Sequence, residues 1–165
     1  MNIVFLDIDG VLNSMPYFES IKGKRSRTHN EIDERHLPYL QRIVKENNAH
    51  IVLSSTWRDL DDINNPTCYA MWQYLIDTLA KYDLTIMSKT PIIDQIRPLE
   101  IKTWLANRKD NIKWISIEDD WNEELYEEYG IGGHLIETKF YPKDISEAGL
   151  LEKHVELAKE LFDKQ

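Results

Sequence analysis

The chain has 165 residues, of which 42% are hydrophobic and 30% are charged, a composition typical of a globular and not of a disordered protein. Because this length suits one domain, we expect residues 1–165 to form a single folded unit. The formal net charge of −9 disfavours nonspecific binding to nucleic acid or to anionic membranes, except where basic residues gather locally.

Signals for export and for membrane insertion are missing from the sequence. The apolar run near Met1 is short and has no basic residues before it, unlike a signal peptide. No stretch approaches the roughly 18 apolar residues of a membrane span. A single cysteine, Cys68, excludes an internal disulfide and fits a reducing compartment. We therefore expect a cytoplasmic protein without a membrane partner, and nothing in the sequence indicates a particular oligomeric state.

Short apolar runs alternate with segments of helical periodicity along the chain. Runs of strand length occur at residues 3–6, 51–53, 84–87, 114–117 and 135–136. Apolar residues spaced by three or four predict helices at residues 37–44, 71–79, 101–105 and 151–162, the first with Asp33 as N-cap and Pro38 in its first turn. Continuous apolar runs are typical of strands that are buried on both faces. The alternation predicts an α/β fold, a doubly wound three-layer sandwich around a mainly parallel sheet.

Two acids and a glycine follow the first predicted strand, at the edge where doubly wound folds bind ligands. Asp7 and Asp9 are two positions apart in an extended segment, so their side chains share one side about 6–7 Å apart, and Gly10 allows a sharp turn. Two carboxylates this close repel each other unless a cation lies nearby, and Mg²⁺ suits an oxygen-ligated site that also binds phosphate. We predict that Asp7 and Asp9 bind Mg²⁺, with Asp7 as nucleophile and Asp9 as proton carrier. The alternative is a surface turn at the end of the strand.

Small hydroxyl groups follow the second predicted strand. Ser54 and Ser55 can donate hydrogen bonds to a phosphate oxygen, and Arg58 can add a bidentate contact. The same residue types are common at helix N-caps, so the cluster predicts substrate binding only together with the other strand ends.

Charged residues gather at two further points in the sequence. Glu118, Asp119 and Asp120 follow the fourth predicted strand, where they would be costly if buried without partners, so we predict metal ligands among them. The alternative is a solvated acidic turn. Arg97 lies at the start of the third predicted helix and Lys102 lies further along it, and either cation could hold a phosphoryl group.

The order of these parts resembles the four motifs of the haloacid dehalogenase (HAD) superfamily over nearly the whole chain. The similarity is greatest to small HAD domains associated with nucleic-acid repair, namely those of polynucleotide kinase-phosphatases and of multi-domain RNA-repair proteins. It rests on residues 7–11 (DIDGV), 49–58 (AHIVLSSTWR), 97–105 (RPLEIKTWL) and 149–150, and on Thr138. The resemblance implies a HAD-like Rossmannoid fold and a Mg²⁺-dependent phosphohydrolase that forms an aspartyl-phosphate.

The resemblance also implies roles for individual residues. Arg97 stands where most of the superfamily has lysine, which leaves Lys102 as an alternative. Glu118 replaces the commoner aspartate or glycine, so the choice of metal ligand among residues 118–120 stays open. The other implied roles are nucleophile for Asp7, general acid/base for Asp9, phosphate binding for Ser54 and magnesium binding for Asp119.

HAD enzymes often select their substrates with a cap domain, and this chain has little room for one. Residues 13–32 are long enough for a small flap only, and the segment before residue 97 is short, so we expect an open site that admits a large substrate. In the flap, Lys24 and Arg25 belong to a basic cluster that could contact a phosphate backbone, whereas Tyr17 and Phe18 could stack on a base or pack on the domain. The predicted substrate is a nucleic-acid end or a nucleotide phosphate. The alternatives are a phosphatase of a small sugar phosphate or other metabolite, and a non-catalytic HAD scaffold that binds RNA or a protein.

Overall fold

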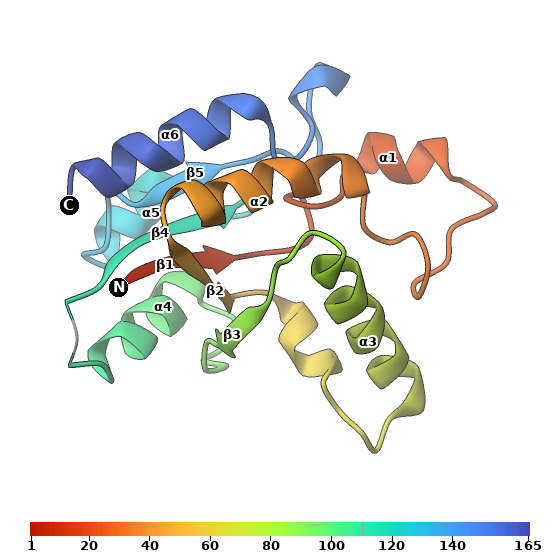
Figure 1. Ribbon diagram of the computed structural model, residues 1–165, viewed down its shortest axis with the longest axis horizontal. Helices are drawn as coiled ribbons and strands as arrows, with labels where there is room; N and C mark the ends of the chain where they lie inside the picture. Colours follow the sequence, from red (N-terminus) through yellow and green to blue (C-terminus); the bar gives the residue numbers. More distant parts are fainter. Residues whose placement is uncertain (110) are drawn as a thin grey trace.

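The computed structural model describes residues 1–109 and 111–165 and contains a five-stranded sheet in the order β3-β2-β1-β4-β5 (Figure 1). Every neighbouring pair of strands in this sheet runs parallel. The strands are β1 (Asn2–Leu6), β2 (Ala49–Leu53), β3 (Ile86–Lys89), β4 (Lys113–Glu118) and β5 (Leu135–Glu137). The predicted doubly wound α/β fold is confirmed, with β1 at the centre of the sheet.

Helices cover both faces of the sheet, and the alternation of side chains along β1 shows this directly. Val4 and Leu6 lie in a core cluster with apolar residues of α2 (Leu37–Glu46), α3 (Pro66–Ala80) and α6 (Glu152–Asp163). Ile3 and Phe5 lie in a second cluster with residues of α4 (Arg97–Ala106) and α5 (Glu123–Glu128). The central strand is therefore buried on both sides, as its continuous apolar run predicts.

Two predicted boundaries are wrong, each for a local reason. The sequence predicts the third strand at residues 84–87, but it spans Ile86–Lys89. The backbone N–H of Leu84 instead donates to the carbonyl of Leu79 and completes the end of α3. Asp33 caps the short 3-10 helix η1 (Glu34–His36), and His36 occupies the N-cap position of α2. Pro38 lies in the first turn of α2, where its missing N–H costs little.

The segment 13–32 forms a flap beside the carboxyl edge of the sheet, and residues 1–109 and 111–165 contain no large inserted cap domain. It contains the short helix α1 (Met15–Ser20), which lies beside the loop after β5 (Figure 1). The backbone N–H of Met15 donates to the carbonyl of Phe140 in that loop. The Tyr17 hydroxyl donates to the Asn30 and Ile32 carbonyls, so this side chain stabilises the fold of the flap.

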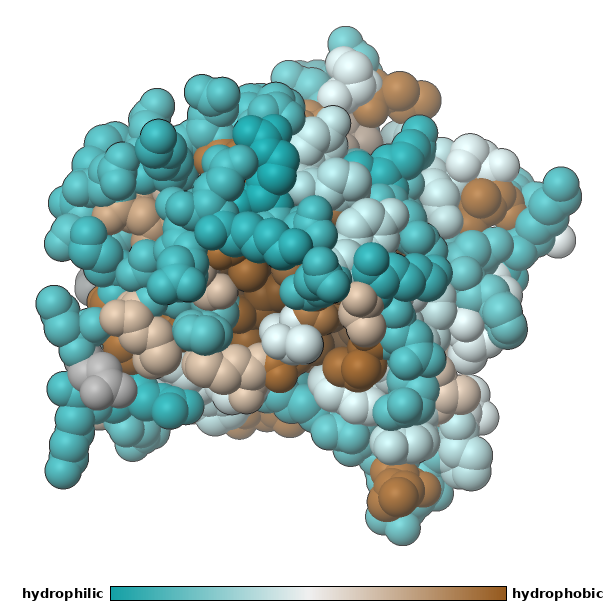
Figure 2. Space-filling model, viewed as in Figure 1, coloured by the Kyte–Doolittle hydropathy of each residue, from teal (hydrophilic) through white to brown (hydrophobic). Residues whose placement is uncertain are grey.

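The remaining turns complete the architecture. Two more 3-10 helices, η2 (Thr56–Leu60) and η3 (Ile145–Glu147), lie in the loops after β2 and β5. Figure 2 shows that hydrophilic side chains dominate the surface over α6 and α2, with apolar side chains gathered below α2. Within the described residues, no helix has the length and apolar character needed to cross a membrane.

Candidate active site

The parallel register places the ends of neighbouring strands next to one another at the carboxyl edge of the sheet. Leu6 pairs with Leu53 on one side and with Ile117 on the other, so the residues that follow them emerge together. The backbone N–H of Asp7 donates to the Ile117 carbonyl at 3.1 Å, and that of Ser54 donates to the Leu6 carbonyl at 2.8 Å. Side chains far apart in sequence are thereby brought to one site.

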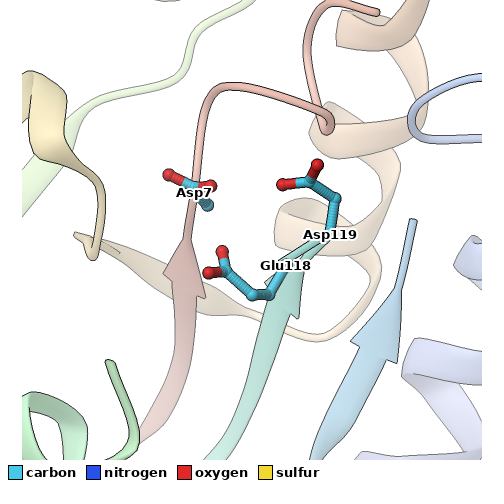
Figure 3. A group of neighbouring side chains, drawn as sticks. All are labelled: Asp7, Glu118 and Asp119. Atoms are coloured by element: carbon cyan, nitrogen blue, oxygen red, sulfur yellow. The ribbon is translucent and has the colours of Figure 1, made fainter. Parts of the chain in front are cut away.

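Three carboxylates converge at the ends of β1 and β4. Asp7, Glu118 and Asp119 each contribute an oxygen, and these oxygens all lie within 4.8 Å of one another (Figure 3). Asp7 and Glu118 are buried, and Asp119 is partly buried. Of the other two predicted ligands, Asp9 lies at the wall of the adjoining cavity outside this trio, and Asp120 is exposed.

The trio is electrostatically costly without a cation. Burial raises the pKa of both Asp7 and Glu118, and the charge of Asp7 raises the pKa of Glu118 further. Burial and the charges of Asp120, Asp7 and Asp9 raise the pKa of Asp119 to about 7. One Glu118 oxygen, Oε2, is buried and has no hydrogen-bond partner among the described residues. A donor set of clustered carboxylate oxygens, one of them unpartnered, fits a small divalent cation such as Mg²⁺.

Gly10 is the residue that lets Asp119 approach the loop after β1. A Cβ at this position would lie 2.1 Å from Cγ of Asp119, and the backbone has a φ of +71°. Both the close approach and the left-handed conformation require glycine. The glycine of the Asp-x-Asp-Gly pattern therefore makes room for Asp119, the acid that follows β4.

Arg97 is the cation that the structure brings to the trio. Its Nη2 lies 3.9 Å from Oδ1 of Asp7, and its Nε lies 3.6 Å from Oε1 of Glu118. Burial favours a lower pKa for Arg97, but the charges of Glu118, Asp7 and Glu100 outweigh it, so the pKa is raised and the guanidinium stays charged. Lys102, the alternative, is exposed, and its Nζ donates to the Tyr129 carbonyl at 2.8 Å.

Arg58 is placed differently from the sequence expectation of a phosphate contact. Its guanidinium is buried, with Nη2 2.7 Å from Oε1 of Glu100 and Nη1 3.1 Å from Oγ1 of Thr90. Glu100 is fully buried and also accepts from Nη1 of Arg97 at 3.0 Å and from the backbone N–H of Ile93 at 3.0 Å. Glu100 thus links the two arginines, a role that nothing in the sequence indicates.

The two serines after β2 occupy different positions. Ser54 Oγ is buried and has no partner among the described residues, so it is available to an incoming oxygen. Ser55 caps η2 by accepting from the backbone N–H of Trp57, and its hydroxyl also bonds to Asp7, which acts to lower the pKa of that acid.

Two residues that the sequence reading did not single out hold Asp9 in position. The side-chain amide of Asn13 donates to Oδ1 of Asp9 at 2.8 Å, and the indole N–H of Trp57 donates to Oδ2 at 3.0 Å. Asn13 also accepts from the backbone N–H of Gly10 at 3.0 Å. The four-residue spacing of Asp9 and Asn13 around a tight turn is a usable signal for the first contact. The Trp57 contact has no local signal.

A cavity of about 590 Å³ opens in front of Asp9 and Asp119. Arg25 lines it from the flap, with its guanidinium paired with Glu31 and lying 3.7 Å above the Phe18 ring. Lys24 is exposed and does not line the cavity. Of the two predicted basic contacts, the structure therefore brings Arg25 to the site.

The sheet order, the acids at the ends of β1 and β4 and the absence of a large cap define a small HAD-like domain. The chain belongs to the family described as the HAD domain in Swiss Army Knife RNA repair proteins, whose model matches residues 3–155. Neither the search of curated proteins nor the search of solved structures found a match. The family expected from the motifs is confirmed.

Proposed function

We propose that this domain is a Mg²⁺-dependent phosphohydrolase that removes a terminal phosphate from a polynucleotide end through an aspartyl-phosphate. The observation that carries the proposal is the position of Asp7: a buried carboxylate at the end of the central strand, within 4.8 Å of two further acids and 3.9 Å from a buried arginine. A binding module has no need of such a costly arrangement.

In the first half of the reaction, a carboxylate oxygen of Asp7 attacks the phosphorus. The bond from phosphorus to the leaving oxygen breaks, and Asp9 gives that oxygen a proton. Hydrogen bonds from Asn13 and Trp57 hold the Asp9 carboxyl group in place. The hydroxyl of Ser54 and the guanidinium of Arg97 bind the non-bridging phosphoryl oxygens.

In the second half, Asp9 takes a proton from a water molecule that attacks the phosphorus of the aspartyl-phosphate. The bond between phosphorus and the Asp7 oxygen breaks, which releases inorganic phosphate and restores the Asp7 carboxylate. Asp7, Glu118 and Asp119 would hold Mg²⁺, which supplies positive charge to balance the acids and the phosphoryl group.

Two features support a polynucleotide end as the substrate. The family is that of a domain in RNA repair proteins. The flap leaves an open cavity, which suits a phosphate carried by a large molecule. A small sugar phosphate remains the second candidate because the cavity volume lies within the range of small-molecule sites, roughly 300–1,000 Å³.

The test is turnover of p-nitrophenyl phosphate with and without Mg²⁺. We expect Asp7→Asn to abolish turnover and the exposed Asp77→Asn on α3 to leave it unchanged. Undiminished activity of Asp7→Asn would contradict the mechanism in which Asp7 is the nucleophile. A panel of 3′- and 5′-phosphorylated oligonucleotides, mononucleotides and sugar phosphates then separates the substrates. A kcat/KM that is highest for a sugar phosphate would overturn the polynucleotide assignment.

A further inference from the structure

The cavity beside the acids is built from three segments that are distant in sequence. One wall comes from the flap and a second from η2 and α3, and the loop after β5 closes the third side. Asp9, Asp119 and Asp120 lie at the acidic end. The other lining residues are Met15, Phe18, Arg25, Arg27 and Glu31 of the flap, Thr56, Trp57, Leu60 and Met71, and Phe140 and Tyr141. The cavity thus joins the reaction centre to a wall of aromatic and basic side chains.

Tyr141 is exposed to solvent, and the residue before it is held in place by contacts with the flap. Its side chain is 74% exposed although it lines the cavity. The preceding Phe140 is held by the backbone hydrogen bond from Met15 and by ring contact with Phe18, with ring centroids 5.9 Å apart. The Phe140 and Tyr141 rings are nearly perpendicular, with an interplanar angle of 80° and ring centroids 4.7 Å apart. The Tyr141 ring is therefore positioned by its neighbours while its own surface stays uncovered.

The flap supplies a positive charge that the protein itself does not neutralise. Arg25 is paired with Glu31, so a carboxylate of the flap itself balances its charge. Arg27 is exposed, lines the same cavity and makes no ion pair or side-chain hydrogen bond with any described residue. In a chain with a net charge of −9, a free arginine at the cavity mouth favours an anionic group at that point.

We propose that this cavity binds the nucleotides next to the terminal phosphate of a single-stranded polynucleotide, with an unpaired base stacked on Tyr141 and a phosphodiester bound by Arg27. The inference rests on the proposed phosphatase function and names its specificity-determining residues. Unpaired bases can turn out and lay a face on an exposed aromatic ring, whereas bases inside a duplex are covered on both faces. A free guanidinium that lines the same cavity as this ring suits the phosphate between one nucleotide and the next. Single-stranded ends longer than one nucleotide should therefore be preferred over mononucleotides and over blunt duplex ends.

The experiment compares kcat/KM for four substrates: a phosphorylated single-stranded trinucleotide, the corresponding mononucleotide, a blunt duplex end and p-nitrophenyl phosphate. Base stacking on an aromatic ring is worth about 1–3 kcal/mol. We therefore expect Tyr141→Ala to lower kcat/KM for the trinucleotide about 5- to 150-fold and to leave p-nitrophenyl phosphate hydrolysis unchanged. Tyr141→Trp should retain the preference for the trinucleotide. The control is Ile145→Ala, which removes an equally exposed apolar side chain outside the cavity.

Arg27→Gln tests the phosphodiester contact by a second readout. In the Asp7→Asn protein, binding of a fluorescent phosphorylated trinucleotide should weaken as the salt concentration rises. Adding Arg27→Gln should reduce the slope of log K against log salt concentration by about the amount expected for one lost phosphate contact. Lys143→Gln is the matched control because Lys143 is exposed in the loop after β5 but does not line the cavity.

The outcomes separate the two proposals. If the wild-type protein hydrolyses none of the substrates, the proposed function fails. If it hydrolyses p-nitrophenyl phosphate and the trinucleotide but Tyr141→Ala lowers neither or lowers both equally, the proposed function stands and the inference is overturned. A kcat/KM that is higher for the blunt duplex or for the mononucleotide than for the trinucleotide also overturns the inference.

Discussion

Replacing Glu100 by glutamine tests whether the buried ionic network supports the candidate site. The Glu100 carboxylate accepts three hydrogen bonds, from Arg58 at 2.7 Å and from Arg97 and the Ile93 backbone at 3.0 Å each. Glutamine keeps one carbonyl oxygen but turns an amide donor toward a guanidinium, which has only donors. One arginine thereby loses its acceptor in a site that excludes water.

The magnitude follows from the burial of all three side chains. Removing one partner of a buried ion pair costs about 3–5 kcal/mol, because the remaining charge stays desolvated and unpaired. We therefore expect Glu100→Gln to lower the free energy of unfolding by about 3 kcal/mol. For a chain of this size that corresponds to a fall in Tm of roughly 6–12 °C. Turnover should also fall, because Arg97 loses the contact that orients it toward Asp7.

Urea unfolding followed by circular dichroism measures the change, and Glu124→Gln serves as the control. Glu124 is exposed on α5, so its replacement should change stability by no more than about 0.5 kcal/mol. In an Arg58→Met background, Glu100→Gln should cost at least 1 kcal/mol less, because Arg58 is no longer present to lose its partner. A loss below 1 kcal/mol for Glu100→Gln alone, or equal losses in both backgrounds, would refute the reasoning.

Three further predictions concern Gly10, the acid Asp119 and a buried histidine. Gly10→Ala should lower the free energy of unfolding by about 2–4 kcal/mol and reduce p-nitrophenyl phosphate turnover at least tenfold, because its Cβ would meet Asp119 at 2.1 Å at a φ of +71°. Asp119→Asn should raise the stability of the metal-free protein by about 1–3 kcal/mol, since it removes repulsion within the trio, and should abolish the rise in Tm on adding Mg²⁺. Burial and the charges of Lys153 and His36 lower the pKa of His154 to about 4. The unfolded chain therefore binds more protons between pH 6.5 and 4, so stability should fall by up to about 3 kcal/mol as the pH drops through that window, and His154→Gln should lose this fall.

Each of these predictions has an outcome that would contradict it, and the glycine prediction also has a control variant. Gly23→Ala has a comparable φ of +81° with no atom within 4 Å of the added Cβ, so it should cost about 1–2 kcal/mol without loss of turnover. If Gly10→Ala and Gly23→Ala changed stability and turnover equally, the close contact between residue 10 and Asp119 would not explain the effect of Gly10→Ala. A metal-free Asp119→Asn protein less stable than the wild type would contradict the repulsion argument. An unchanged stability profile between pH 6.5 and 4 in His154→Gln would show that other groups titrate there.

The sequence by itself determined the fold class and the strand ends that carry the acids. Continuous apolar runs alternating with helical stripes suffice for a parallel sheet, because only strands covered on both faces exclude polar residues in this way. Since parallel strands end at the same edge, Asp7 and the acids after residue 117 could be expected to meet before any coordinates were known. The family followed from the order of the same motifs.

Tertiary structure decided which polar groups contact each other. Arg97 and Lys102 lie on one helix, but five residues rotate a side chain roughly 140° around its axis, so only one of them can face Asp7. The partner of Arg58 is Glu100, which is 42 residues away, and the Trp57 contact to Asp9 spans 48 residues. Phe140 reaches Met15 and Phe18 of the flap only because β5 ends beside β4. Local patterns predict which side chains leave the sheet at its carboxyl edge, whereas the rotation of each helix and the path of each loop depend on packing between distant segments.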